Sequence, residues 1–188
     1  EITYGDWSSD VCSSDLLAAN GSSAYQIVVP DNSPSQVVND NLQQTARLVQ
    51  AAFQANGFKL PIVAESKRDR DKDGVYLGAT ALARASGIDV AKFKGWSYVH
   101  KAVGRDIMIA GRDEAALPKP EKTTVVAWDR VGTAKGAVDF LTRYVGVRFL
   151  YPDLGPRASL KSADSVNFLE SPALEFLKTP TITVPADL

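Results

Sequence analysis

Three aspartates at alternate positions form the first motif in this sequence that could do chemistry. Asp69, Asp71 and Asp73 precede Gly74, which matches the first half of a calcium-binding loop with alternating oxygen ligands and a glycine at the sixth position. Such a loop also needs a bidentate glutamate at its twelfth position, and that position is Thr80 here. The next residues, GVYLG, are typical of a strand rather than of the helix that should follow. We therefore predict a solvated turn and no metal site.

Nucleophilic catalysis would depend on very few residues. His100 is the sole histidine, so a Ser-His-Asp arrangement would have to use it, but it lies within a predicted strand and the sequence has no GxSxG motif. A single histidine also cannot form the usual multi-histidine zinc site. Cys12 is the sole cysteine. We expect His100 to be a partly exposed structural residue of its strand.

Two glycine motifs could bind an anion through backbone N–H groups. Gly111, Arg112 and Asp113 directly follow an apolar strand, and Gly132 and Gly136 stand at the start of a predicted helix. The second motif lacks both the Gly-Lys-Ser/Thr ending and the GxGxxG spacing of nucleotide-binding loops. A triplet such as Gly111-Arg112-Asp113 more often ends a strand in a turn. A glycine within a helix, such as Gly136, more often allows the helix to lie close to the sheet.

Glycoside hydrolysis would require two carboxyl groups at a defined separation, one of them in an apolar setting. The acidic residues lie mostly in polar loops, and helical spacing places Asp139 outward. Aromatic side chains Trp96, Trp128 and Tyr151 could instead stack on sugars or form an interdomain patch, although large residues beside strands more often belong to the core. No catalytic residue and no cofactor site is predicted.

The first 16 residues do not resemble natural protein. Residues 5–16 read GDWSSDVCSSDL, and ten consecutive codons of a common high-throughput sequencing adaptor translate to residues 7–16. Without residues 1–16, which include Cys12 and four of the acidic residues, the formal charge changes from −1 to +3 and no cysteine remains for a disulfide. The remaining length of about 170 residues suits one domain with its own core.

Composition excludes two classes of partner. Lysines and arginines are dispersed rather than clustered in a stripe, so no nucleic-acid surface is expected. No apolar run approaches the roughly 18 residues of a membrane-spanning helix. Residues 17–24 could be a signal-peptide remnant or a linker, which would place the protein outside the cytoplasm.

The apolar pattern predicts an α+β fold with a mixed sheet and helices on one or two faces. Ser33, Pro34 and Gln36 fit the N-cap, N1 and N3 positions of a helix that stops at Asn56-Gly57. Gly104 begins a two-residue connection between the strands of a hairpin. The strands are expected at residues 25–29, 60–64, 74–78, 97–103, 106–110, 123–128 and 147–151, and the helices at 33–56, 80–86 and 132–145.

The segment 132–152, GTAKGAVDFLTRYVGVRFLYP, predicts a helix, a glycine stop and a short buried strand. With the preceding IAGRD, it resembles the N-terminal domain of bacterial α-glucuronidases, a domain that also begins large secreted proteins described only by a domain of unknown function. A second segment, GVYLGATALARASGID, resembles the same family. The resemblance extends over residues 25–154 and rests on Ile109, Gly111, Gly132, Thr133, Phe140, Leu141, Gly146, Val147, Arg148, Phe149 and Pro152.

Two features depart from that family pattern. Thr142 stands where an acidic residue is common, and the loop 112–131 is long. Both lie outside the residues that the pattern uses for packing, so neither changes the expected fold.

The resemblance implies a hexosaminidase domain-2-like fold and an accessory role in front of a (β/α)8 barrel that carries the catalytic acids. The expected organisation is an adaptor-derived segment 1–16, the segment 17–24, an accessory domain at 25–154 and an irregular linker at 155–188. The expected partners are the barrel and a polysaccharide or oligosaccharide. Residues expected to contact substrate or barrel are Trp96, Arg112, Trp128, Arg148 and Tyr151. Alternatives are a stand-alone carbohydrate-binding module that uses the aromatic residues, and a small hydrolase.

Overall fold

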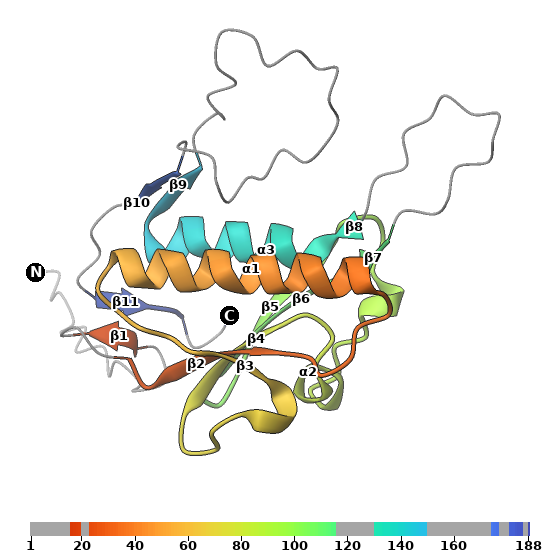
Figure 1. Cartoon of the computed structure of the whole chain (residues 1–188), viewed down its shortest axis with the longest axis horizontal. Coiled ribbons are helices and arrows are strands. Elements are labelled where there is room, and N and C mark those ends of the chain that lie inside the picture. Colours follow the sequence, from red (N-terminus) through yellow and green to blue (C-terminus); the bar gives the residue numbers. More distant parts are fainter. Residues whose placement is uncertain (1–15, 20–22, 116–129, 150–173, 177–180, 186–187) are drawn as a thin grey trace, which may run out of the picture.

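A five-stranded sheet forms the centre of the protein (Figure 1). The computed structural model describes residues 16–19, 23–115, 130–149, 174–176, 181–185 and 188. The strand order is β3-β2-β4-β6-β5, with the first four strands parallel and β5 antiparallel to β6. The strands are β2 (Tyr25–Val29), β3 (Ile62–Ala64), β4 (Asp73–Leu77), β5 (Tyr98–Val103) and β6 (Asp106–Gly111).

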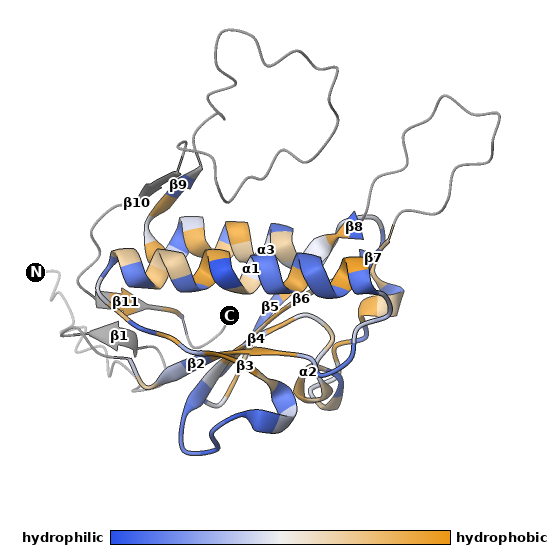
Figure 2. Cartoon of the chain, viewed as in Figure 1, coloured by the Kyte–Doolittle hydropathy of each residue, from blue (hydrophilic) through white to orange (hydrophobic). Residues whose placement is uncertain are grey.

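The three inner strands are apolar along almost their whole length because both faces of the sheet are covered. Side chains alternate between the faces along each strand. Ile27, Val75 and Ile109 belong to the larger core cluster, whereas their neighbours Val28 and Tyr76 belong to the smaller one. In Figure 2 the hydrophobic colour appears on the central strands and also in bands along the helices that cover them.

Two helices cover the first face. α1 (Gln36–Ala55) and α3 (Gly132–Phe140) lie side by side over the sheet (Figure 1). The buried residues of α1 recur at helical spacing and include Leu42, Val49 and Phe53. The predicted N-cap Ser33 is wrong by two positions: the Ser35 hydroxyl accepts a hydrogen bond from the backbone N–H of Val38 at 3.2 Å.

Short helical segments cover the opposite face. α2 (Ala81–Ala85) begins at Thr80, whose hydroxyl accepts the Ala83 N–H at 3.1 Å, and a 3-10 turn follows at Val90–Lys92. Another 3-10 turn, Glu65–Lys67, follows β3. Ala83, Ile88, Met108 and Ala110 form the smaller core with Val28 and Tyr76. The sheet therefore lies between one layer of long helices and one of short helices.

The predicted helix 132–145 is divided into two parts. α3 ends at Phe140 and continues as a π-helical segment, Leu141–Val145. Gly146 follows with φ of 78°, the left-handed conformation that was predicted for this helix stop. β9 (Val147–Phe149) then pairs with β10 (Leu174–Phe176), so it lies outside the central sheet.

The remaining described strands form two more pairs. β7 (Asp113–Glu114) pairs with β8 (Arg130–Val131), and β1 (Leu16–Ala19) pairs with β11 (Thr181–Thr183). The predicted strand 123–128 lies outside the described residues.

The α+β class with a mixed sheet is confirmed, and helices cover both faces. The predicted hairpin is also present, because β5 and β6 are joined at Gly104, whose φ is 60°. β3 is an edge strand, as Pro61 indicated. In the part of the chain that the structure describes, no helix combines the length and apolar character needed to cross a bilayer.

Candidate functional site

The carboxyl end of β6 meets the start of α3 and carries a connected group of paired polar side chains. We call Arg112, Asp113, Glu114, Arg130 and Thr133 the β6-end cluster. They come from β7, β8, the first turn of α3 and the residue after β6. The carboxyl ends of parallel strands are the usual place for ligands in such sheets, so this position is the first to test for chemistry.

Two glycines bring the backbones together at this point. A Cβ atom on Gly111 would lie 2.2 Å from the carbonyl carbon of Gly132 and 2.5 Å from the backbone nitrogen of Thr133. The Gly132 N–H donates to the Arg112 carbonyl at 3.0 Å, and the Arg112 N–H donates to the Ser97 carbonyl at 3.1 Å. The close approach therefore requires glycine and joins β5, β6 and α3.

Asp113 occupies the N-terminus of α3. Its carboxylate accepts the Thr133 N–H at 3.0 Å and the Thr133 hydroxyl at 2.5 Å, while that hydroxyl accepts the Gly111 N–H at 3.0 Å. Burial raises the pKa of Asp113, and the two hydrogen bonds from Thr133 offset part of that rise. An anion that approached these N–H groups would have to displace Asp113. The geometry therefore fits a helix cap rather than the anion site that the glycine motifs could have formed.

The two arginines of the β6-end cluster share one carboxylate. Glu114 accepts from Arg112 Nε at 2.5 Å and from Arg130 Nη1 at 2.7 Å. Arg112 Nη1 also donates to the Phe93 carbonyl at 2.9 Å. Because both guanidinium groups have partners inside the protein, the cluster stabilises the β7–β8 pair and offers little free charge to a ligand.

Trp96 lies in the loop before β5, next to the residue that accepts the Arg112 N–H. Its exposed fraction is 48%, so the core position that is commoner for a tryptophan beside a strand is wrong here. Trp128 and Tyr151 lie outside the described residues. The structure therefore places Trp96 and Arg112 in the same part of the fold, because the Arg112 N–H bonds to the residue after Trp96.

Arg148 belongs to a different region. It is exposed on β9, after the π-helical segment. A helical path of about 20 Å separates β9 from the β6-end cluster, at 1.5 Å per residue. Of the predicted contact residues, the three that the structure describes therefore do not form one site.

His100 is more buried than the sequence indicated, with 10% of its side chain exposed. Its Nε2 lies 2.8 Å from the Gly136 carbonyl oxygen, to which it donates, and its Nδ1 lies 4.0 Å from Asp139 Oδ2. Burial lowers the pKa of His100, the backbone bond and Asp139 oppose that shift, and Arg143 adds to it. These contacts fit a structural residue that joins β5 to α3.

Asp139 does not point simply outward, as helical spacing predicted. Its side chain is 25% exposed and accepts from Arg143 Nε at 2.8 Å. Asp139 is therefore positioned between the sole histidine and an exposed arginine, with no second carboxylate recorded as its partner among the described residues.

The aspartate-rich turn before β4 directs its groups outward rather than toward one point. Asp73 pairs with Arg105 at 3.0 Å and Asp69 with Lys72 at 3.8 Å. Gln26 holds the turn, donating to the Asp69 carbonyl at 2.6 Å and accepting the Asp69 N–H at 3.1 Å. Within the described ranges, no group of three or more His, Cys, Asp or Glu side chains is arranged to hold a metal ion.

Sequence reasoning singled out Gly111 and Gly132 but did not predict that they touch. It also missed Thr133, Glu114 and Arg130 as a connected group. One signal was present: residues of opposite charge, Glu114 and Arg130, flank the loop between β7 and β8 at matching positions. Cross-strand pairs of that kind stabilise short antiparallel strands.

Comparison with known protein families finds no family that matches this chain, and comparison with curated proteins finds no significant match.

Proposed function

We propose that this protein is a non-catalytic N-terminal accessory domain of a carbohydrate-active enzyme related to bacterial α-glucuronidases, with a hexosaminidase domain-2-like fold. In this proposal it supports a following (β/α)8 barrel, and the parent enzyme acts on a polysaccharide or oligosaccharide outside the cytoplasm. The expected surface contacts are Trp96 and Arg112 at one end of α3 and Arg148 at the other.

The observation that supports this proposal is the use of the family-like residues for packing. Gly111 and Gly132 allow two backbones to touch, Thr133 links β6 to Asp113, and Gly146 ends the helical segment in a left-handed conformation. Each of these roles concerns stability. The charged groups nearest to them are partnered within the protein, which suits a supporting domain better than an active site.

The experiment is a glycosidase assay on the purified 188-residue chain, with aryl α-D-glucuronides and glucuronoxylan fragments as substrates. We expect no turnover above the rate of a heat-denatured sample. Turnover that a single substitution abolishes, such as Asp113→Asn or Asp139→Asn, would refute the proposal and support a small hydrolase. Sequencing of the source DNA should also show a reading frame that continues beyond residue 188 into alternating strands and helices. A stop codon directly after residue 188 would contradict the accessory role.

The exposure of Trp96 favours a second candidate, a stand-alone carbohydrate-binding module. An indole that is half exposed can stack on a sugar ring. Isothermal titration of wild type and Trp96→Ala with glucuronoxylan separates the two candidates. Binding that is lost in Trp96→Ala would favour the module, and binding that is absent or unchanged would favour the accessory domain.

A further inference from the structure

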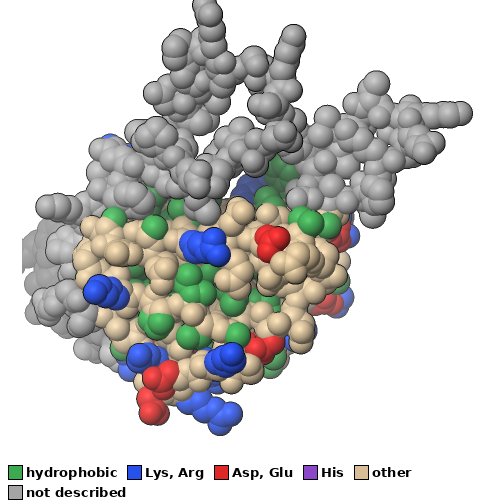
Figure 3. All heavy atoms as spheres, viewed as in Figure 1, with side chains coloured by type: hydrophobic (Ala, Val, Ile, Leu, Met, Phe, Trp, Pro, Cys, Tyr) green, Lys and Arg blue, Asp and Glu red, His purple; other side chains and the backbone are tan. Residues whose placement is uncertain are grey.

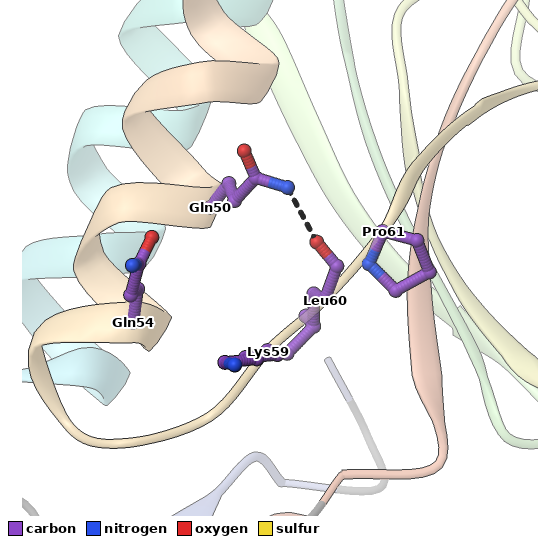
Figure 4. A pocket seen from close by; sticks show the side chains of 5 residues that line it. All are labelled: Gln50, Gln54, Lys59, Leu60 and Pro61. Carbon is purple, nitrogen blue, oxygen red and sulfur yellow. Dashed lines mark hydrogen bonds between the residues drawn. The ribbon is translucent and has the colours of Figure 1, made fainter.

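A hollow of about 320 Å³ lies between the C-terminal half of α1 and the segment that leads into β3 (Figure 4). It is lined by Gln50, Gln54, Lys59, Leu60 and Pro61. Its volume is at the lower end of the range of about 300 to 1,000 Å³ that is usual for small-molecule sites. The hollow is open to solvent, so a ligand such as one sugar unit would lie against its surface and would not be enclosed.

Three of the lining side chains have polar atoms that remain available to a ligand. Gln50 Nε2 donates to the Leu60 carbonyl at 2.7 Å, which fixes the amide and leaves its oxygen as an acceptor (Figure 4). The side chains of Gln54 and Lys59 make no hydrogen bond or ion pair with any described residue, and both are exposed. The hollow thus offers one fixed acceptor, one free amide and one ammonium group, beside the ring of Pro61.

These groups match hydroxyl groups better than a carboxylate. A hydroxyl both donates and accepts, as does a primary amide, and an ammonium group donates to a hydroxyl oxygen. The C-terminus of α1 lies at the same place, and the negative end of its dipole disfavours an anion there. Lys59 offsets that negative end while its three N–H groups remain available. No acidic side chain lines the hollow.

The rest of α1 extends this chemistry. Among its 20 residues, seven are Gln or Asn and only two, Asp40 and Arg47, are charged. An exposed helix face of a globular protein is normally charged or polar, and the polar residues of α1 are mostly uncharged amides. In Figure 3, which looks onto this side of the molecule, charged side chains are scattered, and several of them lie near the lower edge. A face rich in amides and poor in charge is suited to a ligand with many hydroxyl groups.

From these observations we infer that the hollow between α1 and β3 is a binding site for a neutral, polyhydroxylated ligand, namely a sugar unit of a glycan. Gln50 Oε1 accepts a hydrogen bond from one sugar hydroxyl. The Gln54 amide and the Lys59 ammonium group form hydrogen bonds with the neighbouring hydroxyls. The ring of Pro61 contacts the apolar face of the sugar. The site is separate from Trp96 and from the β6-end cluster. It does not depend on the accessory role, because a domain with or without a following barrel can hold it.

The test is a titration of the isotope-labelled 188-residue chain with xylotriose, cellotriose and maltotriose, observed through the side-chain amide resonances of Gln50 and Gln54. We expect saturable shifts with at least one trisaccharide at about 10 mM or below. Gln54→Ala should weaken that binding about fivefold, which corresponds to one ordinary hydrogen bond. Gln44→Ala is the matched control, since it removes the same exposed side chain about 15 Å away along α1, and it should leave binding within twofold.

Three results would overturn the inference. One is the absence of saturable shifts with all three sugars at 50 mM. Another is an equal effect of Gln54→Ala and Gln44→Ala. The last is that sodium acetate alone causes the same shifts, which would make the hollow an anion site on Lys59. Trp96→Ala should leave these shifts intact, so this result is independent of the module test and of the glycosidase assay.

Discussion

Gly111→Ala tests whether the contact between the end of β6 and the start of α3 holds the fold together. The new Cβ atom would lie 2.2 Å from Gly132 C, 2.5 Å from Thr133 N and 2.7 Å from Gly132 Cα. All three are backbone atoms, so no side-chain rotation can relieve the collision. The two backbone segments would have to separate by about 1 Å to restore ordinary van der Waals distances.

The expected cost has two parts. Overpacking in a closed site costs about 1–3 kcal/mol. Separation of the segments also weakens two hydrogen bonds, from the Gly111 N–H to Thr133 Oγ1 and from the Gly132 N–H to the Arg112 carbonyl, each 3.0 Å long. Their net value is about 1 kcal/mol each. We therefore expect Gly111→Ala to lower the free energy of unfolding by about 3–5 kcal/mol, a large part of the 5–15 kcal/mol that is typical of a domain.

The assay is urea unfolding followed by far-ultraviolet circular dichroism, with Gly57→Ala as the matched control. Gly57 has φ of 88° and open space around its Cβ position, so alanine there is strained without a collision. That strain costs about 1–2 kcal/mol. If Gly57→Ala proves as costly as Gly111→Ala, or costlier, the close approach does not determine stability and the reasoning fails.

Three further predictions concern the helix caps and the histidine. Ser35→Ala should lower the free energy of unfolding by about 1 kcal/mol because it removes the N-cap of α1. Ser33→Ala should be neutral because the buried Ser33 hydroxyl has no partner among the described residues. Equal losses of stability in thermal melts of the two variants would contradict this assignment. Thr133→Val should lower the free energy of unfolding by about 2–3 kcal/mol, since it leaves the Gly111 N–H and one oxygen of Asp113 without partners. Thr133→Ser should retain most of the stability. Equal urea unfolding midpoints for the two variants would contradict this prediction. Burial lowers the pKa of His100, so its contribution to stability is complete above its unfolded value near 6.5 and is lost as the pH falls from there through the lower folded value. His100→Gln should therefore reduce the pH dependence of the urea midpoint between about pH 7 and pH 5.5. An unchanged slope would show that other groups cause it, such as Asp113, whose pKa burial raises.

The element types and several of their boundaries could be predicted from the sequence because their causes are local. A glycine first in a two-residue connection, as at Gly104, specifies a hairpin through the backbone of its neighbours, and Gly146 ends a helix for the same kind of reason. The error at the N-cap of α1 has a local cause as well. Serines stand on both sides of Pro34, and the cap rules accept either one, so only the backbone path decides for Ser35.

The candidate site could be predicted only in pieces. Gly111, Arg112 and Gly132 could be singled out from the sequence, but their pattern allows an anion site as well as the favoured turn and close packing of helix and sheet. Whether an N–H group at the start of α3 is free depends on which carboxylate reaches it. Asp113 reaches it because β7 begins one residue after β6 ends, and β8 pairs with β7 just before α3 starts.

The sequence by itself determined the α+β class, the approximate positions of the main helices and of the central strands, and the position of the glycine stops, since these depend on hydrogen bonds and apolar periodicity within a few residues. The tertiary structure alone decided that β2 lies between β3 and β4, that Trp96 is exposed beside Arg112, and that Arg148 belongs to the far end of the helical layer. These outcomes depend on contacts between residues far apart in the chain. Such contacts are selected by the burial of whole faces of helices and sheet, and a local pattern does not specify which faces meet.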